Sequence, residues 1–121
     1  MTKILIIGYS ALSKHMMRVI LESGGYEVIE AENGVVGLER YSLDKPVLVM
    51  FDITSEWLHN IILTTIAKLR EIDPEVRVIV TTTDIQRSTR SQVEALGVRG
   101  LIQKPLKREE VLKAVAETLK G

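Results

Sequence analysis

The sequence predicts an α/β fold built on a five-stranded parallel sheet, and two observations carry this prediction. Short runs of branched apolar residues alternate along the chain with longer runs whose apolar residues recur at helical spacing. Two of the short runs, 4–8 and 47–51, are almost entirely apolar, which is typical of central strands covered on both faces. Because strands and helices alternate strictly, the strands are expected to be parallel and joined by right-handed, helix-sized connections.

The first half of the chain is expected to form two strand–helix pairs. A strand at 4–8 precedes a helix that ends at the serine–glycine–glycine turn at 23–25. The residues of this helix that are expected to face the core share a helical spacing: Leu12, Met16, Val19 and Ile20. A second strand at 26–31, with alternating polarity, leads to a short helix at 34–43 that Asn33 is expected to cap.

The second half of the chain is expected to add three more strand–helix pairs. The strands are expected at 47–51, 76–80 and 99–103, and the helix that follows each of them at 57–72, 84–96 and 111–119, respectively. The two apolar strands belong at the centre of the sheet and the alternating second strand at an edge. This arrangement favours the flavodoxin-like strand order 2-1-3-4-5. Residues 1–121 are expected to form a single domain, because a chain of this length supports one hydrophobic core.

The composition excludes several classes of function. Lys plus Arg and Asp plus Glu each total 16, so the net charge of +0 provides no field that attracts nucleic acid or an acidic membrane. The chain has no cysteine, which excludes disulfides and thiolate metal sites. No apolar run is long enough to cross a membrane, and the first residues lack the pattern of a secretory signal. We therefore expect a cytoplasmic protein whose partners are neither nucleic acid nor membrane.

Chemistry is expected at the carboxyl ends of the strands, where ligands bind in open α/β sheets. Asp52 ends the most apolar strand, and a carboxylate is costly there unless it is partnered or functional. Threonines at 81–83 end the fourth strand and Lys104 follows the fifth, so a carboxylate, a hydroxyl and an ammonium group converge on one edge. Such a trio suits a phosphoryl group, which an aspartate can carry while the other two groups contact its oxygens. Position alone is equally consistent with Asp52 as a cap of the following turn.

Three segments resemble those of a known family: the stretch GYEVIEAENG, Asp52 after an apolar strand, and Lys104-Pro105 before the last helix. Over its whole length the chain is similar to the response regulator receiver domains of two-component signalling, the CheY-like domains. This resemblance implies that Asp52 is the phosphoryl acceptor, Thr82 the hydroxyl switch residue and Lys104 the phosphate-sensing lysine. We also expect the peptide bond between Lys104 and Pro105 to be cis.

The sequence departs from the family pattern where a metal ion is normally held. Two of the three carboxylates that the family uses to hold Mg²⁺ are absent, because Gly8 and Tyr9 stand where a pair of acidic residues is expected. Mg²⁺ usually needs one or two carboxylates besides phosphate oxygens, so we expect weak or absent Mg²⁺ binding and no other cofactor. Glu56 or His59 could compensate. The aromatic residue usual on the fifth strand is replaced by Leu101.

The resemblance and its departures lead to three interpretations of function. The first is an atypical receiver, or pseudo-receiver, that is not an enzyme and acts through protein–protein interaction. Its partners would be signalling proteins, such as a histidine kinase or an output protein, bound through the face between the fourth and fifth helices. The second is a conventional Mg²⁺-dependent receiver that a histidine kinase phosphorylates on Asp52. The third is a small-molecule sensor that uses the same crevice at the strand ends, with Tyr9 and Ser10 as its floor.

Overall fold

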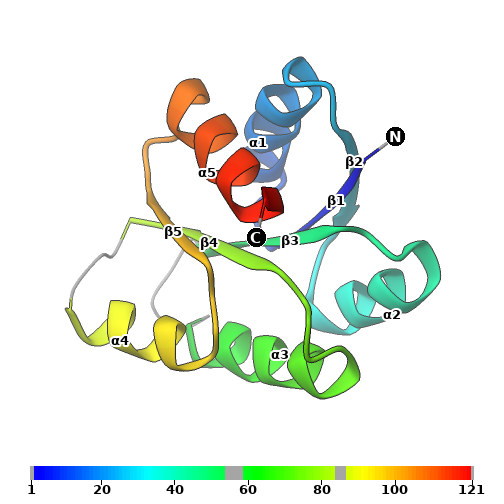
Figure 1. Ribbon diagram of the computed structural model, residues 1–121, viewed down its shortest axis with the longest axis vertical. Coiled ribbons are helices and arrows are strands. Elements are labelled where there is room, and N and C mark those ends of the chain that lie inside the picture. Colours follow the sequence, from blue (N-terminus) through cyan, green and yellow to red (C-terminus); the bar gives the residue numbers. More distant parts are fainter. Residues whose placement is uncertain (1, 54–58, 84–86, 121) are drawn as a thin grey trace.

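The computed structural model describes residues 2–53, 59–83 and 87–120. Strands and helices alternate in the order β1 (Lys3–Gly8), α1 (Ala11–Ser23), β2 (Glu27–Ala31), α2 (Gly34–Asp44), β3 (Leu48–Ile53), α3 (His59–Ile72), β4 (Val78–Thr82), α4 (Arg87–Ala95), β5 (Gly100–Gln103) and α5 (Arg108–Lys120). The five strands form one parallel sheet in the order β2-β1-β3-β4-β5, which confirms the flavodoxin-like order. Helices α1 and α5 cover one face and α2, α3 and α4 the other (Figure 1).

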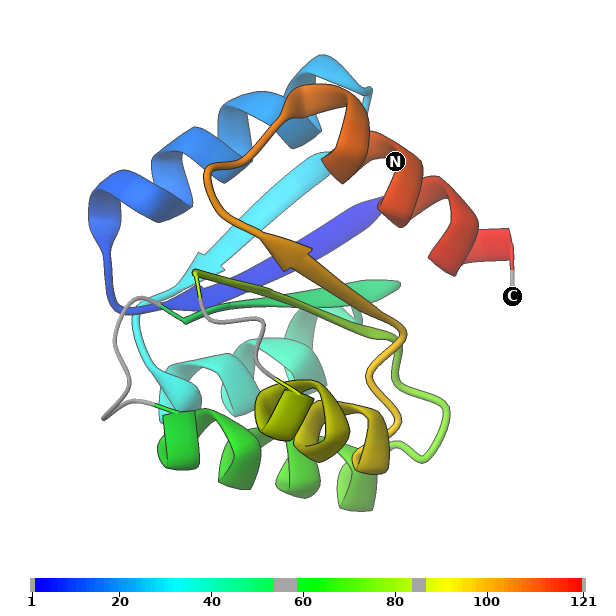
Figure 2. The ribbon, with the colours of Figure 1, turned by 90° about the vertical axis from the view of Figure 1, so that its left-hand side faces the viewer.

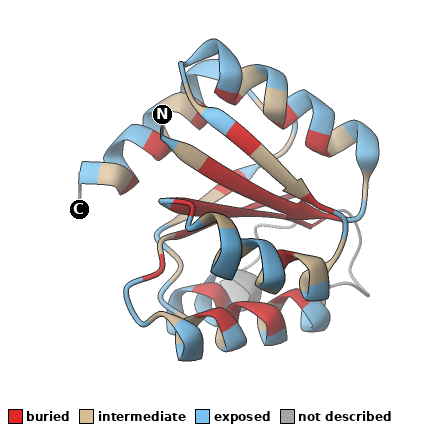
Figure 3. Ribbon diagram, turned by 90° about the vertical axis from the view of Figure 1, so that its right-hand side faces the viewer, coloured by how far each residue is buried: buried red, intermediate tan, exposed pale blue. Residues whose placement is uncertain are grey.

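The sheet separates two hydrophobic cores. One includes Phe51, Ile66 and Leu69 and lies on the side of α2, α3 and α4, while the other includes Met17 and Val115 and lies under α1 and α5. All six residues of β3 are buried, and burial is concentrated on the central strands and on the inner faces of the helices (Figure 3). The central position that the apolar runs predicted for β1 and β3 is therefore confirmed.

All strands run in one direction, so their carboxyl ends gather at one edge of the sheet (Figure 2). The register between β1 and β3 places Gly8 beside Asp52, and the register between β3 and β4 places Thr81 on the other side of Asp52. The peptide bond between Lys104 and Pro105, just after β5, is cis as expected. This edge is where the predicted site residues come together.

Helix α1 buries a different face from the one expected. Met17 and Leu21 are completely buried, and Lys14, on the same face, is only 7% exposed. Of the four residues expected in the core, Ile20 packs against it, whereas three are largely exposed at 70%, 49% and 53%, respectively: Leu12, Met16 and Val19. Apolar residues occur on two faces of this helix, so spacing alone did not select the face that packs against β1 and α5.

Several boundaries differ from the expected ones for local reasons. Strand β4 begins two residues later than expected, because Val76 is still part of the turn after α3, where its N–H donates to the Asp73 carbonyl at 3.1 Å. Asn33 caps α2 as expected, since its side-chain oxygen accepts the Val36 N–H at 2.9 Å. The expected start of the third helix at 57 and the start of the fourth at 84 lie outside the described residues. No helix in the described part of the chain is long and apolar enough to cross a membrane.

Candidate functional site

Asp52 lies at the carboxyl end of β3 and is completely buried. Its neighbours in the sheet are Gly8 of β1 and Thr81 of β4, so it sits between two strands whose side chains there are small or hydroxylated. A buried carboxylate requires partners that compensate for the loss of water. The contacts of its two oxygens therefore define the site.

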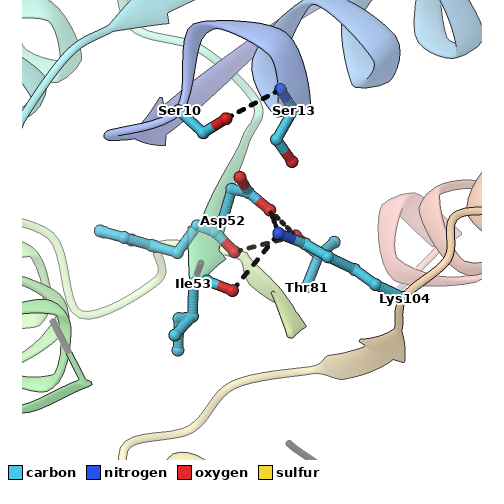
Figure 4. A network of polar contacts seen from close by, with 7 residues as sticks. Ser10, Ser13, Asp52, Ile53, Thr81 and Lys104 are labelled. Atoms are coloured by element: carbon cyan, nitrogen blue, oxygen red, sulfur yellow. Dashed lines mark hydrogen bonds and ion pairs between the residues drawn. The ribbon is translucent and has the colours of Figure 1, made fainter. Parts of the chain in front are cut away.

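One carboxylate oxygen of Asp52 has two strong partners. Its Oδ1 lies 2.5 Å from the Lys104 ammonium nitrogen and accepts a hydrogen bond from the Thr81 hydroxyl at 2.8 Å. The same ammonium group donates to the Ile53 carbonyl at 3.3 Å (Figure 4). Strands β3 and β4 and the segment after β5 thus bring a carboxylate, a hydroxyl and an ammonium group together at one edge of the sheet.

The second oxygen of Asp52, Oδ2, is buried and has no hydrogen-bond partner among the described residues. In Figure 4 it points to the side on which Ser10 and Ser13 lie, away from Lys104 and Thr81. An unsatisfied buried oxygen costs free energy of about 1 to 3 kcal/mol, so its presence favours a ligand or a transferred group at this position. This atom is the one through which Asp52 can act.

Thr82 occupies the last position of β4 and is buried. Its backbone carbonyl accepts the Lys104 N–H at 2.9 Å, which ties β4 to the segment that carries the lysine. The hydroxyl that bonds the carboxylate in this conformation belongs to Thr81, one position earlier. The switch role that the resemblance assigns to Thr82 stays a prediction.

The position next to Asp52 on β1 lacks the side chain of a metal ligand of the usual kind, and the space there is tight. A Cβ atom built on Gly8 would lie 3.1 Å from the Asp52 Cβ and 3.4 Å from the Lys14 Cγ. Among the described residues no group of three His, Asp or Glu side chains could hold a metal ion. With one carboxylate and two nearby lysines, the described residues do not fit Mg²⁺. Glu56 and the side chain of His59 lie outside what the structure describes.

Lys14 is a residue of the site that the sequence analysis missed. It belongs to α1 and shares a helical face with Met17 and Leu21, both fully buried. The helical spacing that placed Leu12, Met16 and Val19 in the core assigned no role to Lys14. The available signal was a lysine three and seven residues before two core positions, a spacing that places it on the same side of the helix.

The remaining predicted features lie beside the site. Ser10 caps α1 through a bond from the Ser13 N–H at 3.1 Å, and Tyr9 is 40% exposed. Tyr9 lines a hollow of about 330 Å³ between the starts of α2 and α3, together with Asn33, Gly34, Val35, Leu38, Ile61, Thr64, Thr65 and Lys68. This lining does not include Asp52. Because the lining also lacks Ser10, this hollow is not the crevice with Tyr9 and Ser10 as its floor that was considered for a small-molecule sensor.

Comparisons with known proteins agree with this geometry. The model of the response regulator receiver domain family matches residues 4–116. The chain is 34% identical over 118 residues to the chemotaxis protein CheY of Bacillus subtilis, covering 97% of each chain. It is 29% identical over 121 residues to the protein PilH of Pseudomonas aeruginosa, covering 100% of each.

Solved structures show the same fold. The chemotaxis protein CheY4 of Vibrio cholerae superposes with a TM-score of 0.88 at 21% identity, over 98% of both chains. The family match spans nearly the whole sheet and its helices, including the strand that carries Asp52 and the segment that carries Lys104. The chain belongs to the response regulator receiver domains of two-component signalling, and it is of the CheY-like kind.

Proposed function

We propose that this receiver is atypical and acts as a protein-interaction module, without a Mg²⁺-dependent phosphorylation cycle. The observation that carries the proposal is the position of Gly8 beside Asp52, with the stem of Lys14 next to it. A typical receiver has carboxylates there. This chain has Gly8 and Tyr9 there, with Lys14 of α1 nearby, so the charge that would attract a divalent cation is missing.

The loss of the metal affects both steps of a phosphorylation cycle. Phosphoryl transfer is catalysed mainly by positioning and by neutralising the charge on the transferred group, and a metal ion normally supplies much of that neutralisation. Lys104 supplies a single positive charge, already engaged with Asp52 and the Ile53 carbonyl. Phosphorylation and hydrolysis at Asp52 are therefore slow, and the chain is not an enzyme.

Partners of this domain are signalling proteins that recognise its folded surface in the cytoplasm. The face made by α4, the edge strand β5 and α5 suits this role, because Arg90 and Arg99 are exposed on it and a hollow of about 320 Å³ lies between β5 and α5. The net charge of +0 argues against nucleic acid and membrane as partners. An output protein or a histidine kinase is the kind of partner that binds here.

One observation favours the alternative, a conventional receiver phosphorylated on Asp52. Oδ2 of Asp52 is unpartnered, while Lys104 lies at its other oxygen, an arrangement in which a phosphoryl group on Oδ2 would meet a positive charge. This alternative requires Mg²⁺ ligands from the part of the chain outside the described residues, such as Glu56. The two interpretations differ in whether Mg²⁺ binds at low millimolar concentration.

The test is a Mg²⁺ titration followed by the fluorescence of Trp57, the single tryptophan, with and without beryllofluoride. We expect no saturation in the low-millimolar range in either case. Asp52→Asn serves as the control, because it removes the carboxylate with little change in shape. Saturable Mg²⁺ binding that this control abolishes would replace the proposal with the conventional receiver.

A further inference from the structure

The described part of the site carries a net positive charge where the family normally has a negative one. Asp52 contributes one carboxylate, while Lys104 and Lys14 contribute two ammonium groups. A site with three carboxylates and one lysine attracts a divalent cation. The one carboxylate and two ammonium groups described here favour binding of an anion and disfavour binding of a metal ion.

Lys14 is held beside Asp52 by packing. It is 7% exposed on the inner face of α1, and its Cγ lies 3.4 Å from the point that a Gly8 Cβ would occupy. The Asp52 Cβ lies 3.1 Å from that same point. The lysine stem therefore fills the space left by the glycine, and the flexible end beyond Cγ can bring the ammonium group to a ligand on Asp52.

The ammonium group of Lys14 has no competing partner in the part of the chain that the structure describes. It forms no hydrogen bond or ion pair with a residue in the described ranges, whereas the Lys104 ammonium bonds both Asp52 and the Ile53 carbonyl. The stem of Lys14 is buried, and its ammonium group is free to meet a negative charge that enters the site. Oδ2 of Asp52 is also unpartnered, so two groups at this site lack a ligand.

We infer that Lys14 takes the place of the metal ion and that the site binds a tetrahedral oxyanion, such as phosphate, in the absence of any divalent cation. Lys14 and Lys104 contact the oxyanion from two sides. The serines at 10 and 13, which lie on the side of the free Asp52 oxygen, can donate hydroxyl hydrogen bonds to it (Figure 4). This inference deepens the proposed function, because it concerns the same Asp52 site and explains what that site recognises when Mg²⁺ does not bind.

The experiment titrates inorganic phosphate into the protein in excess EDTA, with sodium chloride at matched ionic strength as the reference. Amide chemical shifts provide the readout. We expect saturable shifts at Gly8, Lys14 and Asp52, which sodium chloride does not reproduce. No saturation in EDTA, or saturation only after Mg²⁺ is added, would overturn the inference. Because this measurement uses the unmodified protein, it does not depend on the folding of any variant.

Three variants then test the role of Lys14. Lys14→Gln should weaken phosphate binding by at least about tenfold, while Lys14→Arg, which keeps the charge, should bind within about threefold of the parent. Lys113→Gln removes an exposed lysine of α5 and should leave binding unchanged. If Lys14→Gln and Lys113→Gln weakened phosphate binding equally, the effect would come from the overall charge of the protein, and a specific site at Lys14 would be refuted. These outcomes are independent of the Mg²⁺ titration, so this inference and the proposed function can fail separately.

Discussion

Two aspartates at opposite ends of the strands, Asp52 and Asp73, differ in how their carboxylate oxygens are hydrogen-bonded. Asp73, in the turn between α3 and β4, uses both oxygens: it accepts from the Tyr41 hydroxyl at 2.6 Å and from the Glu75 N–H at 2.9 Å. Asp52, at the carboxyl end of β3, uses one oxygen and leaves the other buried without a partner in the described residues. Both oxygens of Asp73 thus stabilise the turn, whereas Asp52, at the carboxyl ends of the strands, keeps one oxygen for a ligand.

The two aspartates also differ in the groups that stabilise their negative charge. The hydrogen bond from Tyr41, followed by the one from the Glu75 backbone, lowers the pKa of Asp73 below its usual value. Desolvation by burial, followed by the bond to Asp73, raises the pKa of Tyr41. The hydrogen bonds to Asp73 thus come from neutral donors, with a smaller contribution from the charge of Arg70. Asp52 depends on the full positive charge of Lys104, which makes it more sensitive to substitution.

The largest effect is expected from removing the Asp52 carboxylate. Asp52→Ala leaves the Lys104 ammonium, whose side chain is only 13% exposed, without its counter-charge. Breaking such a pair from one side typically costs about 3 to 5 kcal/mol. We expect about 3 kcal/mol here, because Lys104 keeps its bond to the Ile53 carbonyl. Urea denaturation measures the free energy of unfolding.

The matched control removes both charges. Asp52→Ala combined with Lys104→Met should recover most of the loss, because replacing a buried ion pair with apolar groups is often neutral. A double-mutant cycle then isolates the pair from the separate effects of each substitution. If Asp52→Ala alone were as stable as the parent, Asp52 would not depend on Lys104 and the contrast with Asp73 would fail.

The next effect is expected from restoring acids at the metal position. Gly8→Asp with Tyr9→Asp should raise Mg²⁺ affinity by at least about tenfold but lower the stability in EDTA by about 1 to 2 kcal/mol. The loss has two causes: the new Cβ would lie 3.1 Å from the Asp52 Cβ, and clustered carboxylates repel one another. Gly8→Ala is the control, because it adds the Cβ beside Asp52 without a charge and so measures the stability loss that is due to crowding alone. A double variant that melts higher than the parent in EDTA would refute the repulsion argument.

The Asp73 turn offers a smaller effect with a defined pH window. Tyr41→Phe should cost about 1 kcal/mol at neutral pH, since it removes one hydrogen bond. Because the pKa of folded Asp73 is lowered, its contribution is lost as pH falls below about 4 toward that lowered value. Because the pKa of folded Tyr41 is raised, its contribution is lost as pH rises above about 10 toward the raised value.

The difference in unfolding free energy between parent and Tyr41→Phe, measured across this range, tests the assignment. We expect a plateau between about pH 4 and 10 and a decline on both sides. A difference that stays constant from acid to alkaline pH would mean that the bond to Asp73 does not contribute.

The sequence predicted the strand order and the convergence of Asp52 with Lys104, because both depend on patterns within single elements. Continuous apolar runs identify β1 and β3 as central, and strand ends in a parallel sheet share one edge. The sequence did not predict Lys14, because α1 has apolar residues on two faces and only packing against β1 and α5 selects one. It also did not show whether Thr81 or Thr82 bonds the Asp52 carboxylate. The register between β3 and β4 decides this, and that register cannot be read from the two threonines alone.

The smallest effect is expected at a distance from Asp52, on the surface of β5 and α5. In a typical receiver an aromatic residue on the fifth strand moves inward when the acceptor carries phosphate. The residue here is Leu101, half-buried and packed against the core on the side of α3 and α4. An aliphatic side chain already in contact with the core gains little from moving, and a ligand shifts a two-state equilibrium only through differential affinity.

We therefore expect the surface formed by residues 87–119 to keep one conformation whether or not Asp52 carries beryllofluoride, and partners to recognise it constitutively. The amides around Asp73 provide the internal reference, because that turn is satisfied and remote from the site. Shifts near Asp52 must first confirm that the mimic is bound. Shifts at 99–103 should then be no larger than those around Asp73. Large shifts running from Thr82 to Leu101 would mean that the free oxygen of Asp52 controls a working switch, and that the domain is a conventional phospho-receiver.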